Sequence, residues 1–156
     1  MRIAILLLTI CCSELLADSF DFRRTTDDPE ILMYLQDLAT RGSRLVDQQE
    51  VAAFIVQDTA GATSCLLWPH TANTRSEHYL GAIPAGTVAL AHTHPLFAEH
   101  PSKGDVAESK RLHLPIYVIT RWNLYVTDPQ SGQHVALIAN KNWVRNVARH
   151  ECALIK

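Results

Sequence analysis

The chain has 156 residues, of which 47% are hydrophobic and 19% are charged, so it can bury a core and is not a disordered chain. Its 14 Lys and Arg residues against 16 Asp and Glu residues give a formal net charge of -2, which excludes the basic footprint of a nucleic-acid-binding protein. The length is ample for one domain and short for two, and four cysteines are too few for a disulfide scaffold.

Residues 1–17 have the pattern of a secretory signal peptide. A basic residue precedes an apolar run from Ile3 to Cys12, which is too short to span a bilayer comfortably. Ala17 is a small residue at a suitable cleavage point, and a buried terminal helix is the alternative. The pattern predicts an exported protein, periplasmic or secreted, whose single domain occupies residues 18–156 and has no stable membrane span.

The first helix is predicted directly after residues 18–28, which are polar and expected to be irregular. Asp28 is a suitable N-cap, and Pro29 and Glu30 suit the first helical turn. Apolar residues follow at helical spacing, and Gly42 is expected to end the helix.

Short apolar runs between turn-forming residues predict the strands. These runs are residues 51–56, 63–68, 87–93, 116–120, 124–127 and 134–138. Residues 58–61 and 121–123 are predicted as hairpin turns, and residues 69–86 as a long loop. Helices are predicted at 102–113 and at about 141–154, the latter with its apolar side facing inward. This order predicts an α/β domain in which helices flank a mixed β-sheet.

Two cysteines, Cys65 and Cys152, remain after removal of residues 1–17. In an exported compartment an isolated pair of this kind favours a disulfide bond. Two unpaired, buried cysteines are the alternative.

The residues that indicate chemistry begin with His92, on the predicted strand 87–93, and His94, directly after it. Residues two apart on a strand project to the same face, so both imidazoles can point at one position. Asp105 lies in the first turn of the following helix, and two imidazoles with one carboxylate suit Zn²⁺. Ser102 and Asp105 also form an ordinary helix-capping pattern, which explains both residues without a metal.

Three protein ligands would leave one position for a water molecule, which then needs a proton acceptor that is not itself a ligand. Glu50, at the start of the first core strand, is the preferred candidate for this general acid/base. Its rivals are Glu77, Glu99 and Glu108, of which Glu99 is the strongest because it lies on the loop after the histidines. Ser102 is expected to donate a hydrogen bond to the oxyanion of a tetrahedral intermediate.

Glu50, the sequence HTHP at residues 92–95 and the Ser102-x-x-Asp105 pattern together resemble the signature of the JAB/MPN (JAMM) metalloprotease domain. The resemblance spans roughly residues 29–130. It implies that His92, His94 and Asp105 ligate zinc, that Glu50 is the acid/base and that Ser102 stabilises the transition state. It also implies a cytidine-deaminase-like fold of the compact, exported bacterial type, because no insertion is large enough to hold a ubiquitin-sized partner.

The function that the resemblance implies is a zinc-dependent peptidase or isopeptidase. Its substrate is expected to be a protein or a cell-wall peptide. The alternative is a non-catalytic JAB-fold binding or scaffold module in an exported system, against which the retention of all five signature residues argues. A nucleobase deaminase is excluded, because the chain has no P-C-x-x-C sequence to supply its cysteine ligands.

Overall fold

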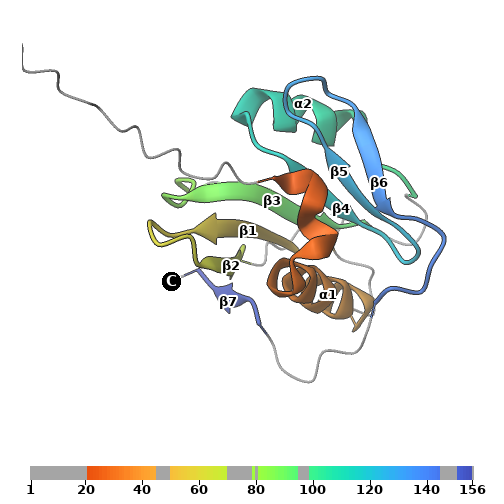
Figure 1. Cartoon of the computed structure of the whole chain (residues 1–156), viewed down its shortest axis with the longest axis horizontal. Coiled ribbons are helices and arrows are strands. Elements are labelled where there is room, and N and C mark those ends of the chain that lie inside the picture. Colours follow the sequence, from red (N-terminus) through yellow and green to blue (C-terminus); the bar gives the residue numbers. More distant parts are fainter. Residues whose placement is uncertain are drawn as a thin grey trace, which may run out of the picture.

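The structure is a computed structural model that describes residues 21–44, 50–69, 79, 81–94, 99–144 and 151–155, so the predicted signal peptide lies outside it. Its elements are shown in Figure 1. In chain order they are η1 (Phe22–Asp27), α1 (Pro29–Arg44), β1 (Ala52–Gln57), β2 (Thr63–Leu67), β3 (Thr87–Thr93), α2 (Lys103–Leu112), β4 (Ile116–Ile119), β5 (Leu124–Thr127), β6 (His134–Ile138) and β7 (Ala153–Leu154). Within the described ranges, no helix combines the length and the apolar character needed to cross a membrane.

The strands form one mixed sheet in the order β6-β5-β4-β3-β1-β2-β7. β3 pairs with β4 and β2 pairs with β7 in parallel, while the other neighbours pair antiparallel. Each of the six predicted strands is present with its ends within one residue of the prediction. The α/β class with a mixed sheet is therefore confirmed.

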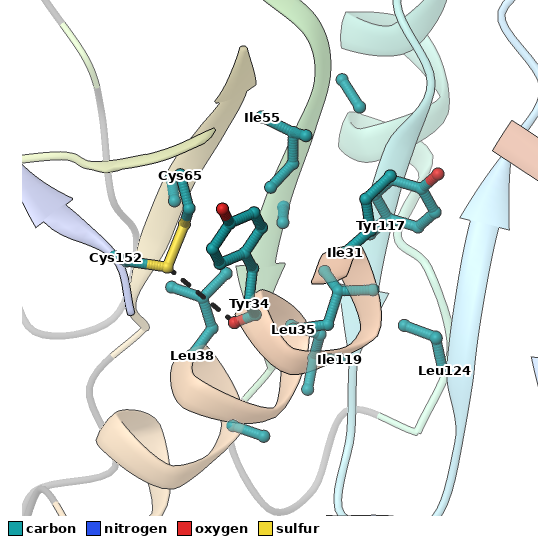
Figure 2. Packing of buried hydrophobic residues seen from close by; sticks show 14 of the residues in the cluster. Ile31, Tyr34, Leu35, Leu38, Ile55, Cys65, Tyr117, Ile119, Leu124 and Cys152 are labelled. Carbon is teal, nitrogen blue, oxygen red and sulfur yellow. Dashed lines mark hydrogen bonds between the residues drawn. A yellow bond between two sulfur atoms is a disulfide. The ribbon is translucent and has the colours of Figure 1, made fainter. Parts of the chain in front are cut away.

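The two faces of the sheet pack against different helices. On one face, Leu35 and Leu38 of α1 are fully buried in a cluster that includes Tyr117 of β4 (Figure 2). On the other face, a second cluster contains Leu90 of β3 and receives Leu112 of α2. Because alternate residues of a strand point to opposite faces, the side chains of β3 that follow Leu90 by two and four residues lie on the α2 face.

Helix α1 begins as predicted but ends later. The Asp28 carboxylate accepts hydrogen bonds from two backbone N–H groups of the first turn, which makes it the N-cap. The predicted end at Gly42 is wrong, because the helix continues to Arg44. A Cβ atom at Gly42 would lie 2.8 Å from Oγ1 of Thr93. The glycine therefore permits the close approach of α1 to β3 and does not form a C-cap.

This close approach makes the effect of a helix-favouring substitution change sign. Gly42→Ala would stabilise an exposed helix by about 1 kcal/mol, but here we expect a loss of about 1–3 kcal/mol from overpacking. Thr93 is buried, and its hydroxyl accepts a hydrogen bond from the backbone N–H of Val51, so it has no room to move aside. Denaturant unfolding followed by circular dichroism measures the change in free energy.

Thr93→Ser provides the control for this prediction, because it removes the methyl group that faces Gly42 and keeps the hydroxyl. We expect Gly42→Ala to cost less in the Thr93→Ser background than in the original chain. An equal cost in both backgrounds would place the clash on the Thr93 hydroxyl oxygen, which serine retains at 2.8 Å from the added Cβ. A gain in stability from Gly42→Ala would show that the helix and the strand are not in close contact.

The segment before α1 is more ordered than predicted, because residues 22–27 form the 3-10 helix η1. The Asp21 carboxylate accepts a hydrogen bond from the backbone N–H of Arg23 and caps this helix. Thr25 is buried and hydrogen-bonded to the hydroxyl of Tyr117, and Arg23 forms an ion pair with Asp128 at 2.7 Å. These partners lie about 90 residues or more away in sequence, so the local pattern gives no sign of them.

The predicted helix at 141–154 is wrong for the residues that the structure describes. Residues 141–144 and 151–155 are not helical, and residues 145–150 lie outside the description. Trp143 is nevertheless buried in the α1 core and Val144 packs against it, so the inward direction of these two side chains is confirmed. Residues 153–154 form β7 beside β2.

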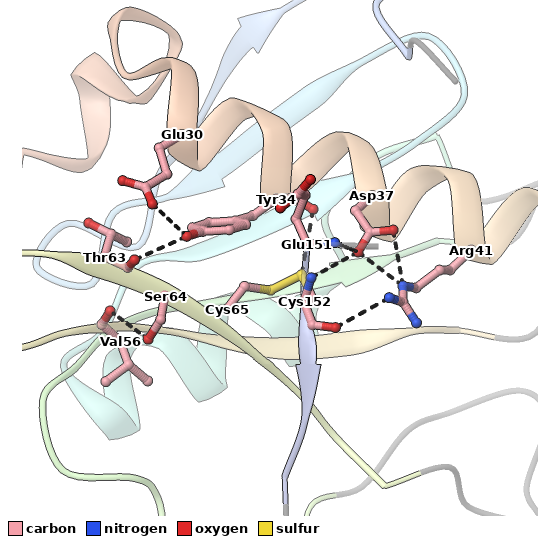
Figure 3. The surroundings of a disulfide bond; sticks show 10 residues. All are labelled: Glu30, Tyr34, Asp37, Arg41, Val56, Thr63, Ser64, Cys65, Glu151 and Cys152. Carbon is pink, nitrogen blue, oxygen red and sulfur yellow. Dashed lines mark hydrogen bonds and ion pairs between the residues drawn. A yellow bond between two sulfur atoms is a disulfide. The ribbon is translucent and has the colours of Figure 1, made fainter. Parts of the chain in front are cut away.

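A disulfide and a buried carboxylate hold this last segment in place (Figure 3). Cys65 of β2 is bonded to Cys152 with a sulfur–sulfur distance of 2.04 Å, which confirms the predicted disulfide. The Asp37 carboxylate of α1 accepts hydrogen bonds from the backbone N–H groups of Glu151 and Cys152, each at 3.0 Å. It also forms an ion pair with Arg41. Because these contacts fix the backbone beside β2, an extended conformation is favoured over a helical one in this segment.

Candidate metal centre

Strand β3 presents the two histidines near the middle of the sheet. His92 lies opposite Ala52 of β1 and Val118 of β4. The backbone N–H of His94 donates to the carbonyl oxygen of Ile119 at 2.8 Å, which continues the pairing with β4 past the end of β3. The two imidazole rings lie side by side, with their centroids 4.9 Å apart. The prediction that both side chains share one face of a strand is confirmed.

The start of α2 supplies the carboxylate. Ser102 is the N-cap, and its hydroxyl oxygen accepts a hydrogen bond from the backbone N–H of Asp105 at 3.1 Å. The Asp105 side chain accepts a reciprocal hydrogen bond from the backbone N–H of Ser102 at 2.6 Å. The capping pattern predicted from the sequence is therefore present, and it fixes the orientation of the Asp105 carboxylate.

The same carboxylate faces both histidines. Nε2 of His92 lies 3.2 Å from Oδ1 of Asp105, and Nε2 of His94 lies 3.3 Å from Oδ2. One ligand atom from each residue can be chosen so that all three lie within 4.8 Å of one another, so the cluster could hold a metal ion. The capping role and the ligand role are thus compatible in one residue.

The electrostatic environment keeps the carboxylate ionised. Burial raises the pKa of Asp105, but hydrogen bonds from His92 and His94 and from the Ser102 backbone outweigh this and hold the pKa well below its usual range. The side chains of the three residues are only 6–16% exposed, so the negative charge lies in a partly dehydrated position. A charged carboxylate beside two imidazoles is a suitable donor set for a divalent cation.

A cavity of about 740 Å³ opens beside this cluster, and Glu50 is among its lining residues with His92, His94 and Asp105. Glu50 lies just before β1, and the next residue, Val51, accepts a hydrogen bond at its carbonyl oxygen from the N–H of Thr93 at 2.9 Å. This bond continues the pairing of β1 with β3, so Glu50 lies beside the histidine-bearing end of β3.

The rival carboxylates lie in different positions. Glu77 is outside the described residues. Glu99 is exposed and is not among the described residues that line the cavity. Glu108 lines the cavity but accepts two hydrogen bonds from the guanidinium of Arg111, at 2.8 and 2.5 Å. Of the three candidates that the structure describes, Glu50 and Glu108 line the cavity, and Glu50 lies directly beside the histidine-bearing end of β3.

Ser102 and His100 differ in their positions relative to the cavity. Ser102 is exposed and lines the cavity, so its hydroxyl can reach a bound molecule. His100, two residues before Ser102, is not among the described lining residues. Its ring lies instead near Tyr125 and His134, with centroid distances of 5.3 and 6.5 Å.

Sequence reasoning missed the apolar part of the cavity. Phe54, Trp68 and Tyr79 line it together, although they come from β1, the end of β2 and the loop predicted at 69–86. Trp68 packs on Phe54 with a ring-centroid distance of 5.3 Å. The alternation of β1, with Ala52 and Phe54 on one face, was the signal that could have placed an aromatic ring beside His92.

Comparisons of the chain with protein-family models, with curated proteins and with solved structures gave no match. The resemblance to the JAMM signature therefore rests on the sequence motif alone.

Proposed function

We propose that the protein is a zinc-dependent peptidase or isopeptidase of the JAMM type, with a cytidine-deaminase-like fold. The observation that carries the proposal is the convergence of His92, His94 and Asp105 at one end of a cavity that Glu50 also lines. Its substrate class is a peptide or protein, including a cell-wall peptide. The disulfide between Cys65 and Cys152 supports the exported location, periplasmic or secreted, because such bonds persist in oxidising compartments.

Zinc suits the donor atoms of this cluster. Zinc bonds of about 2.0 Å in a tetrahedral arrangement place neighbouring donor atoms roughly 3.3 Å apart. The two nitrogen–oxygen distances in the cluster are 3.2 and 3.3 Å, each to a different oxygen of Asp105, and one ligand atom from each residue lies within 4.8 Å of the other two, so the side chains would move closer together around an ion. Three ligands from the protein leave one position open, and zinc would there supply Lewis acidity and lower the pKa of a water molecule.

Glu50 is assigned the proton transfer. Glu50 lines the same cavity as the histidines and is outside the three-residue cluster. In the proposed reaction, the Glu50 carboxylate accepts a proton from the attacking water and donates it to the nitrogen of the leaving amine. One group then serves as base and acid, and amide cleavage balances without another co-reactant.

Ser102 is assigned the stabilisation of the developing oxyanion. Its oxygen accepts the capping hydrogen bond from Asp105, so that bond does not use the proton of the hydroxyl group. That proton can be donated to the carbonyl oxygen of a substrate in the cavity. The capping box therefore holds the zinc ligand and the oxyanion donor in fixed relation to each other.

Zinc binding provides the direct test. We expect demetallated protein, titrated with Zn²⁺ in a calorimeter, to bind one ion per chain, and His92→Ala to weaken binding by at least about 100-fold because it removes a ligand. Elemental analysis after dialysis checks the stoichiometry. His100→Ala is the matched control, because this exposed histidine lies outside the cluster. A correctly folded protein that binds no zinc would refute the proposal.

The scaffold alternative is separated from the enzyme by activity. Suppose that the zinc-loaded chain cleaves neither peptides nor purified cell-wall sacculi. If the His92→Ala variant also binds every partner that the original chain binds, the protein would be a binding module. Cleavage of sacculi in preference to protein substrates would identify the cell-wall peptide as the substrate.

A further inference from the structure

The cavity has two chemically different ends. The metal-cluster end carries Glu50, His92 and Asp105, whereas the opposite end is lined by apolar side chains. We group as the apolar end the lining residues that are linked to Phe54 by strand pairing, ring contacts, the hydrophobic cluster or the hydrogen bond from the Tyr79 hydroxyl to the carbonyl oxygen of Ala82: Phe54, Trp68, Tyr79, Ile83, Leu90 and Leu112. The cluster and Glu50 use only the first end, so the proposed chemistry does not account for the second.

The pairing of β1 with β3 makes the floor of the cavity change from polar to apolar in steps. Ala52 lies opposite His92, and Phe54 lies opposite Leu90. Residues two apart on a strand lie about 7 Å apart, so the apolar floor begins one such step from His92. In an extended peptide bound along the floor, this distance separates the scissile bond from a side chain on the first or second residue beside it.

Trp68 and Tyr79 form an aromatic wall that packs on Phe54 of this floor. Phe54, Trp68 and Tyr79 contact one another pairwise, with ring centroids 4.9–5.4 Å apart. Phe54 and Leu90 are only 1% and 5% exposed, so the accessible part of this end is formed by the partly exposed Trp68 and Tyr79 and by Ile83, which is 42% exposed. An accessible apolar wall of this kind gains free energy when a second apolar group covers it.

The charges at this end favour a neutral occupant. Glu108 and Arg111 of α2 line the cavity and form a two-point ion pair with each other. Their opposite charges largely cancel, and the other carboxylates among the described lining residues, Glu50 and Asp105, lie at the metal-cluster end. A charged side chain would therefore lose its hydration in the apolar end without gaining a partner there.

We infer that the apolar end of the cavity is a specificity pocket that binds one aromatic or large aliphatic side chain of the substrate, on a residue within two positions of the scissile bond. This inference rests on the proposed peptidase function for the position of the scissile bond. Burial of such a side chain in place of alanine is expected to raise kcat/KM by about 10- to 100-fold.

The three tryptophans of the chain provide a binding test that needs no activity. Trp68 lines the pocket, Trp122 is 45% exposed on the β4–β5 turn and Trp143 is buried in the α1 core. We expect N-acetyl-phenylalaninamide, titrated into ¹⁵N-labelled protein, to shift the indole N–H signal of Trp68 and to leave the other two in place. N-acetyl-glycinamide is the matched probe and should shift none of them.

Cleavage provides the second test. A mixture of tryptic peptides is digested with the zinc-loaded protein, and mass spectrometry maps the cleaved bonds. We expect large apolar residues to be enriched within two positions of these bonds. Trp68→Ala and the milder Ile83→Ala should reduce the enrichment by about 10-fold or more. Trp122→Ala and Leu154→Ala, at exposed positions outside the cavity, are the matched controls and should leave it unchanged.

The outcomes separate this inference from the proposed function. Cleavage without enrichment of apolar residues, or a Trp68 signal that does not respond to the phenylalanine probe, overturns the specificity pocket and leaves the peptidase in place. A selective shift of the Trp68 signal without any cleavage overturns the peptidase and supports only the binding of an apolar side chain. Ile83→Ala keeps the test decisive even where Trp68→Ala fails to fold, because Ile83 is exposed.

Discussion

Replacement of Glu50 by glutamine is expected to lower kcat for peptide hydrolysis by about 10²- to 10⁴-fold, which is the usual contribution of a general acid/base. Glutamine has nearly the same shape as glutamate but cannot accept the proton of the attacking water. Because Glu50 lies outside the three-residue cluster, zinc affinity should stay unchanged. Initial rates on a cleaved peptide, with zinc content measured on the same sample, give both quantities.

Glu99→Gln is the matched control for this experiment. Glu99 is exposed on the loop after β3 and is not among the described residues lining the cavity, so the same chemical change there should leave kcat within about twofold of the original value. If Glu99→Gln instead abolished activity while Glu50→Gln did not, the two roles would have to be exchanged. If Glu50→Gln also abolished zinc binding, Glu50 would be a ligand.

Loss of the disulfide should have the largest effect on stability. The bond between Cys65 and Cys152 closes a loop with a sequence separation of 87 residues. Loop-closure entropy on this scale corresponds to about 4 kcal/mol. We therefore expect the double variant Cys65→Ala/Cys152→Ala to lose about that amount in the free energy of unfolding, measured by denaturant titration under oxidising conditions.

A reducing agent tests whether the loss comes from the bond itself. The original chain should lose a similar free energy of unfolding when it is reduced, whereas the double variant should not respond to the reducing agent. Equal stability of the oxidised and reduced forms would show that the Asp37 hydrogen bonds to Glu151 and Cys152 hold the segment without the disulfide.

The strands were predictable because the sequence pattern that defines each of them is local. The apolar run from Thr87 to Thr93 is bounded by turn-forming residues, and the strand has those ends in the structure. Gly42 shows the opposite case. A glycine near the end of a helical pattern normally predicts a C-cap. Here the glycine instead permits a close approach to Thr93, which lies 51 positions further along the chain and is not part of any local pattern.

The end of the chain was mispredicted for the same reason. Residues 141–154 have helical periodicity, yet their conformation is set by partners elsewhere in the fold. Cys152 is bonded to β2, and its backbone N–H is bonded to Asp37 of α1. These contacts stabilise an extended backbone more than the weak intrinsic preference of the segment stabilises a helix.

The positions of the candidate cluster residues could be predicted from the sequence even where parts of the fold could not. The two-residue spacing of His92 and His94 fixes a shared face on any strand, and the capping pattern fixes Asp105 at the first turn of α2. Trp68 and Tyr79 meet only after β1, β2 and the following loop are folded together. The three residues of the candidate metal cluster were therefore predictable from the sequence, whereas the apolar end of the cavity was not.

The two-residue strand β7 has a consequence for self-association. In the part of the chain that the structure describes, β7 covers the outer side of β2 at Leu66 and Leu67 and is itself the last strand on that side. A border this short offers a neighbouring molecule few main-chain groups for strand addition, which protects sheet proteins from forming fibrils. Reduction of the disulfide that holds β7 would therefore uncover β2 and make the protein more prone to aggregate.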